Sequence, residues 1–110
     1  MNNMKINSRQ RAYLKSLAMK EDPIYHIGKE SLTAEIVKGL DDAIEARELI
    51  KVAVLKNCDD DIRAIAETAA ERTRSVLVQV IGRRFVLYRP AKKPRICLPD
   101  IVSQKNRPKL

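Results

Sequence analysis

Two spacings of apolar residues alternate along this chain, and the alternation limits the folds open to it. Apolar residues that recur at helical spacing indicate helices, and short runs rich in β-branched residues indicate strands. In chain order the segments are helical at 8–20, strand-like at 24–27, helical at 33–47, strand-like at 49–55, helical from 59–61 onward, and strand-like at 76–80 and 85–88. This order predicts an α/β fold, α-β-α-β-α-β-β, in which helices pack on a mixed four-stranded sheet.

Polar residues and one glycine mark where these segments start and turn. Ser8 and Thr33 are suitable N-caps for the first two helices, and the acidic run Asp59–Asp61 suits the start of the third. Gly82 and Arg83 fit a two-residue hairpin turn, with glycine supplying the positive φ. Strand–helix–strand units predict parallel neighbours, and the hairpin predicts an antiparallel last pair.

The length and the proline pattern indicate one domain followed by a short tail. The chain has 110 residues, of which 45% are hydrophobic, enough for one modest core. After Pro90 the regular spacing stops, although Ile96 and Leu98 could dock on the domain. We therefore expect a domain over residues 1–99 and a basic, flexible tail over 100–110.

Positive charge is concentrated at the two ends of the sequence. Residues 1–20 carry five Lys or Arg and no acid, a net +5. Residues 21–82 carry eight basic and thirteen acidic residues (−5), and residues 83–110 carry nine basic residues and one acid (+8). Such a distribution suits a polyanion, most often nucleic acid. A solvated surface with a basic tail is the alternative.

The sequence also argues against several classes of protein. No apolar run is long enough to span a bilayer and no signal peptide is visible, so we expect a cytoplasmic protein with no membrane partner. Cys58, Cys97 and His26 are too few for a zinc site and supply no nucleophile–base pair. We expect no metal, no cofactor, no small-molecule substrate and no catalytic residue, and hence a protein that is not an enzyme.

The turn Gly28–Ser31 joins a predicted strand to a predicted helix, where free backbone N–H groups can hold a phosphate. Gly28 permits close approach of a backbone, and Lys29 supplies a positive charge. An ordinary loop is the alternative interpretation, because many such turns contain Gly and Lys.

Further basic residues are candidates for phosphate contacts because of their charge alone. They lie on the outer face of the first helix, at the hairpin tip and in the segment after it: Arg9, Arg11, Lys15, Arg83, Arg84, Lys92 and Lys93. Tyr25 and Tyr88 could stack on bases, but packing within the domain is commoner for a tyrosine in a strand.

Several stretches together resemble a known family. Residues 46–52 read ARELIKV, residues 77–83 read LVQVIGR, and residues 86–90 read VLYRP. The segment 23–29, with Pro23-Ile24 followed by Ile27-Gly28-Lys29, matches as well. Over roughly residues 8–99 the chain resembles the CRM domain in its stand-alone bacterial form, the YhbY-like proteins.

The resemblance implies a fold similar to the C-terminal domain of bacterial translation initiation factor three. It implies RNA binding, with ribosomal RNA in precursors of the large ribosomal subunit as the partner, and possible contacts to ribosomal proteins. The family carries a G-x-x-G loop between its first strand and second helix, similar to the KH-domain loop that clamps a nucleic-acid backbone.

The chain departs from the family at this loop. Where the family reads Gly-Lys-Gly-Gly, residues 28–31 read Gly28-Lys29-Glu30-Ser31, with Thr33 at the start of the next helix. Glu30 adds a negative charge and Ser31 a side chain where RNA backbone should approach. Two interpretations follow: a weakened loop contact compensated by the basic ends, or a module that docks on a ribosomal protein or assembly factor and binds RNA weakly.

Overall fold

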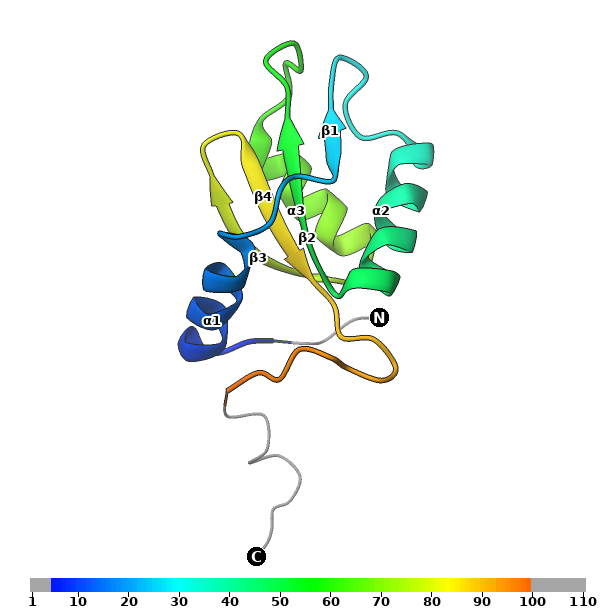
Figure 1. Cartoon of the computed structure of the whole chain (residues 1–110). Coiled ribbons are helices and arrows are strands. Elements are labelled where there is room, and N and C mark those ends of the chain that lie inside the picture. The colour runs from blue at the N-terminus through cyan, green and yellow to red at the C-terminus, as the bar shows by residue number, and fades with distance from the viewer. Residues whose placement is uncertain (1–4, 100–110) are drawn as a thin grey trace, which may run out of the picture.

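The computed structural model describes residues 5–99, and its helices and strands follow the predicted order (Figure 1). The elements are α1 (Ser8–Ala18), β1 (Tyr25–Ile27), α2 (Ala34–Arg47), β2 (Leu49–Val54), α3 (Ile62–Arg72), β3 (Val76–Ile81) and β4 (Arg84–Tyr88). The predicted α/β class with a mixed four-stranded sheet is confirmed. The boundaries differ from the prediction by one or two residues, as frayed ends usually do.

The strands lie in the order β1-β2-β4-β3. β1 and β2 are parallel neighbours, as predicted for the unit that contains α2. The same prediction is wrong for β2 and β3, because β4 lies between them and pairs antiparallel with both. Residues 85–88 of β4 are buried without interruption, which suits a strand that has neighbours on both sides and cover on both faces.

Each face of the sheet has its own core. On one face, Val52 and Phe85 pack with α2 and α3 in the main hydrophobic cluster. On the other face, Tyr88 packs with Leu14 of α1 and with Leu98 in a smaller cluster. α1 covers only the end of this second face where β2 begins and β4 ends, so the rest of the face is left without a helix (Figure 1).

The helix starts confirm Thr33 as a cap and the acidic start of the third helix, and they correct the predicted cap Ser8. Thr33 and Asp61 accept backbone N–H groups at the starts of α2 and α3. Ser8 does not cap α1; Asn7 does, its side-chain oxygen accepting from the Gln10 amide at 2.8 Å while Gln10 accepts from the Asn7 amide at 3.0 Å. This reciprocal capping box satisfies two free donors, which a cap at Ser8 would not do.

Glu48, between α2 and β2, holds the segment that follows β4, residues 90–99, here named the C-terminal strap. Its side chain is fully buried, and its backbone is in the left-handed region at φ 69°. The carboxylate accepts N–H groups from Ala91, Arg95 and Ile96 at 2.9 to 3.0 Å. Burial alone would raise the pKa of Glu48, but these bonds and the nearby Arg95 charge hold that pKa below its ordinary value.

The strap closes against α1. Leu98 is buried and Ile96 is partly buried in the smaller cluster, which confirms that both dock on the domain. Gln10 donates from Nε2 to the carbonyl of Pro99 at 2.9 Å. The predicted flexible tail, 100–110, lies outside the described residues, so the division at residue 99 remains a prediction.

Candidate nucleic-acid interface

The open part of the second sheet face carries two rows of cross-strand neighbours. The first row crosses all four strands: His26, Ala53, Arg84 and Ile81. The second row crosses three strands: Lys51, Val86 and Gln79. Because side chains alternate between the faces of a strand, Lys51 and Arg84 point away from the helices that cover their neighbours in sequence.

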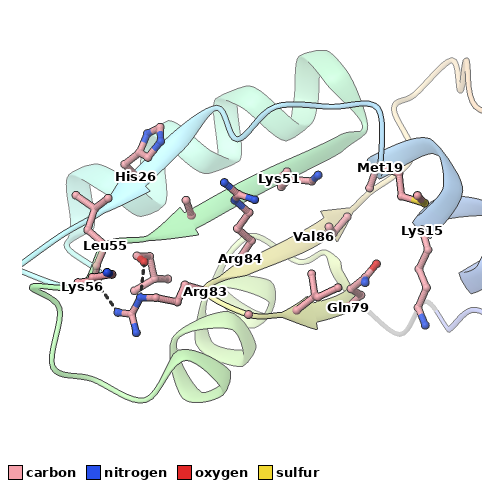
Figure 2. Close-up of a pocket in the computed structure, with 15 residues that line it drawn as sticks. Lys15, Met19, His26, Lys51, Leu55, Lys56, Gln79, Arg83, Arg84 and Val86 are labelled. Atoms are coloured by element: carbon pink, nitrogen blue, oxygen red, sulfur yellow. Dashed lines mark hydrogen bonds between the residues drawn. The ribbon is translucent and has the colours of Figure 1, made fainter.

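These rows form the floor of a groove of about 620 Å³, bordered by the end of α1 and by the β3–β4 hairpin (Figure 2). The groove is lined by five Lys and Arg residues and by no acidic residue: Lys15, Lys51, Lys56, Arg83 and Arg84. Within residues 5–99, none of these five cations forms an ion pair, and Arg83 bonds only to carbonyls. The groove therefore presents uncompensated positive charge, which attracts a polyanion.

Arg83 fixes the hairpin tip to the end of β2. Its Nε donates to the carbonyl of Val54 at 3.0 Å and its Nη2 to that of Leu55 at 2.6 Å. The Val54 amide in turn donates to the Arg83 carbonyl at 2.7 Å. Gly82 has φ 58°, as predicted for the turn. Arg83 thus contributes charge at the rim and also sets the position of Arg84.

Arg11 corrects the prediction that it lies on the outer face of α1. It is partly buried, and its Nη1 donates to the carbonyls of Leu77 and Val78 at 2.9 and 2.6 Å. The pairing of β3 with β4 shifts register between Leu77 and Gln79, and a bulge of this kind takes carbonyls out of the ladder. Arg11 satisfies these carbonyls and so fastens α1 to the sheet.

The turn Gly28–Ser31 lies between β1 and α2, as predicted. The Ser31 amide donates to the Gly28 carbonyl at 2.9 Å, and Ser31 has φ 60°. The residue that replaces the family's last glycine therefore adopts a conformation that glycine favours. Lys29 and Glu30 are exposed beside each other, and Thr33 uses its side chain as the cap of α2.

An acidic hollow lies between this turn and the start of α3. It measures about 330 Å³ and is lined by Ser31, Asp60 and Asp61, among others, with no Lys or Arg. Asp61 also accepts the Ala64 amide, so the start of α3 is already capped by a carboxylate. This hollow repels a phosphate rather than attracting one.

The other predicted contacts lie apart from the groove. Arg9 is exposed on α1, and Lys92 and Lys93 are exposed on the strap; none of the three lines the groove. Tyr88 is buried, and burial together with the nearby carboxylate of Glu48 raises the pKa of Tyr88 to about 12. Tyr25 packs on α2, so that a Cβ added at Gly39 would lie 2.1 Å from its hydroxyl. For both tyrosines the structure shows packing, the alternative to base stacking.

Sequence reasoning missed four polar residues that the fold brings to the groove: His26, Lys51, Lys56 and Gln79. A signal was available for Lys51. A lysine in the middle of the apolar strand 49–54 must point away from the helix-covered face, and the same parity applies to Gln79 in β3. The register that brings them together could not be read from the sequence.

Residues 5–99 hold neither a metal-binding cluster nor a membrane-spanning helix. No group of three or more His, Cys, Asp or Glu side chains is placed to hold a metal ion. No helix in this range is long and apolar enough to cross a membrane. Cys58 is buried and Cys97 is exposed, and both are free thiols.

Comparison with known proteins places this architecture in a family. Residues 6–89 match the CRS1 / YhbY (CRM) domain. The chain belongs to this domain family. The CRM-domain resemblance noted in the sequence is thereby confirmed over most of the chain.

Individual relatives align with most of the chain. The protein named "Probable RNA-binding protein YqeI" from Bacillus subtilis is 41% identical over 88 residues, which is 80% of this chain and 92% of that protein. An "RNA-binding protein" from Haemophilus influenzae is 32% identical over 94 residues, 86% of this chain and 95% of its own length. The solution structure of the hypothetical protein SAV1595 from Staphylococcus aureus is 49% identical, with a TM-score of 0.74, and covers 86% of this chain and 100% of that one.

Proposed function

We propose that this CRM-domain chain binds RNA without catalysis, and that its target is ribosomal RNA in precursors of the large ribosomal subunit. One observation carries the RNA binding: a groove on the open sheet face is lined by five cations and no acid. The names of the relatives support it, since two of them are called RNA-binding proteins. The ribosomal target, and with it a cytoplasmic location, rests on the resemblance to YhbY-like proteins.

The groove suits a phosphate backbone because its charges come from three directions. Lys15 comes from α1, Lys51 from β2, and Arg84 from the start of β4, so all three line the same groove (Figure 2). Each can neutralise one phosphate and release its counterion, the main source of affinity in such complexes. Of the residues predicted to contact phosphates, Lys15, Arg83 and Arg84 line this groove.

The turn Gly28–Ser31 has a secondary role in this proposal. Lys29 is exposed and can meet a phosphate, but Glu30 beside it and the aspartates of the acidic hollow oppose the contact. Arg9, Lys92 and Lys93 would add long-range attraction. The interpretation in which basic groups compensate for a weakened loop is therefore favoured, with the sheet groove as the principal site.

Crosslinking in growing cells followed by sequencing of the attached RNA tests the target. We expect reads concentrated on large-subunit ribosomal RNA, and far fewer with the variant Lys51→Glu/Arg84→Glu. A matched variant, Lys38→Glu/Arg63→Glu, changes two exposed charges on α2 and α3, away from the groove, and should keep the reads. Reads that follow cellular RNA abundance and do not respond to the groove variant would contradict the proposal.

A further inference from the structure

Exposed apolar side chains gather at the cationic groove. In the described part of the chain, four large apolar residues are exposed by more than a third: Tyr13, Met19, Leu55 and Ile81. Three of them, Met19, Leu55 and Ile81, line the groove. Met19 is 81% exposed and Ile81 is 59% exposed, and exposed apolar side chains gathered in one groove are typical of a binding surface.

Apolar and charged groups alternate across the groove. Ile81 is the cross-strand neighbour of Arg84, and Met19 follows the turn of α1 that carries Lys15. Beneath them, the floor includes the aliphatic side chains of Ala53 and Val86. A ligand in this groove would meet positive charge and apolar surface at the same time (Figure 2).

These two chemistries together discriminate between forms of RNA. A double helix presents phosphates and 2′-hydroxyls and hides the faces of its bases, so it has nothing to place against Met19 or Ile81. An unpaired strand presents phosphates and base faces together. We propose that the groove holds an unpaired stretch of RNA. Its phosphates lie on the cations, and its bases lie against Met19 and Ile81, here named the apolar rim. This inference rests on the proposed function and specifies its substrate.

The groove also indicates how selective the contact is. Many sheets that bind single strands stack bases on aromatic rings, but no Phe, Tyr or Trp lines this groove. Aliphatic contacts accept any base, so the apolar rim gives little sequence preference. Gln79 and His26 are the two polar side chains of the lining besides its Lys and Arg, and both can hydrogen-bond the edge of a base. A modest base preference should therefore depend on these two residues.

The first experiment compares two RNAs at one salt concentration. The probes are an unstructured single strand of about ten nucleotides and the duplex formed with its complement. We expect the single strand to bind about tenfold more tightly, although the duplex carries more charge. Equal or tighter binding of the duplex would overturn the inference and leave RNA binding in place. No binding of either probe would count against the proposed function itself.

The second experiment removes the apolar rim and keeps every charge. Met19→Ser/Ile81→Thr should weaken single-strand binding about fivefold, the low end of what a base contact contributes, and leave duplex binding unchanged. The dependence of affinity on salt should not change, because no phosphate contact is lost. Tyr13→Ser removes the one of these four exposed apolar side chains that lies outside the groove, and it is the matched control. Unchanged single-strand affinity in the rim variant, with an unchanged melting temperature, would overturn the inference and show that these side chains do not contact the RNA.

Discussion

Two hollows of this domain have opposite charge. The groove on the open sheet face is lined by five cations and no acid, whereas the hollow beside the turn Gly28–Ser31 is lined by Asp60 and Asp61 and no cation. The turn occupies the position of the family's G-x-x-G loop, and its Ser31 still has the positive φ of a glycine. A backbone shape can thus persist where the surrounding charge differs, and charge then identifies the better site for a polyanion.

Reversing charge in the groove should have the largest effect on binding. Lys51→Glu/Arg84→Glu places two carboxylates where phosphates are expected, and we predict a loss of affinity for ribosomal RNA fragments of about a hundredfold. Fluorescence titration at fixed salt measures it. Lys38→Glu/Arg63→Glu changes the net charge equally on the helical face and should cost less than about threefold. Equal losses in both variants would mean that net charge, not the groove, governs binding.

The dependence of RNA affinity on salt should also distinguish the unmodified protein from the groove variant. If the groove neutralises about five phosphates of a single strand, log affinity falls with log salt at a slope of roughly −3.5, or about fiftyfold from about 50 to 150 mM salt. The groove variant should flatten this slope by about one to two. A slope near zero for the unmodified protein would exclude a mode of binding dominated by phosphates.

A substitution at Glu48 tests whether RNA binding requires α1 in its place beside the groove as well as the groove's charges. In Glu48→Gln the amide group places an N–H where Ala91 and Arg95 donate, so we predict a loss of about 2 kcal/mol in the free energy of unfolding. Denaturant unfolding measures this loss. If a loosened strap lets α1 shift, RNA affinity falls although no groove charge has changed.

The same carboxylate predicts a dependence of stability on pH. The pKa of Glu48 is lowered in the folded state, so its contribution is fully present above the unfolded pKa and is lost as pH falls through the folded pKa. Melting temperature should therefore drop between about pH 5 and pH 3. Glu48→Gln should show a smaller drop over the same range; an identical drop would assign the acid sensitivity to other carboxylates.

Restoring the family's turn should have the smallest effect. Glu30→Gly/Ser31→Gly removes a negative charge and a Cβ, and we predict about fivefold tighter binding. Glycine at position 31 also relieves the φ of 60°, which offsets the added freedom of the unfolded chain, so the melting temperature should stay nearly constant. Lys29→Glu should weaken binding. If neither variant changes affinity, the turn does not touch RNA, and the contrast between the two hollows is complete.

The sequence was sufficient to predict the fold class because local signals agreed with one another. Apolar spacing located every helix and strand, and Thr33, Asp61 and Gly82 marked two helix starts and the hairpin turn. The strand order was only half predictable. Nothing local in residues 76–88 says that β4 rather than β3 pairs with β2, because that choice depends on contacts between distant segments.

The candidate site was less predictable because it depends on register. Lys15, Arg83 and Arg84 could be selected by charge, but Lys51 joins them only through the pairing of β2 with β4. Charge alone was also misleading for Arg11, because its guanidinium donates hydrogen bonds to two carbonyls at the bulge in β3. A bulge changes hydrogen bonding without a reliable sequence signal.

The contact between Gln10 and Pro99 brings the start of the first helix against the end of the strap. A domain whose first and last described segments touch can be permuted without rearranging what lies between them. Here this contact lies at the end of the sheet that α1 covers, and the cationic groove is lined by residues of the sheet beyond α1. Joining residues 7 and 99 through a short linker and opening the chain at residues 29–30 would give a circular permutant that keeps the groove intact. Such a permutant should still bind RNA, because the groove depends on how the segments pack and not on their order along the chain.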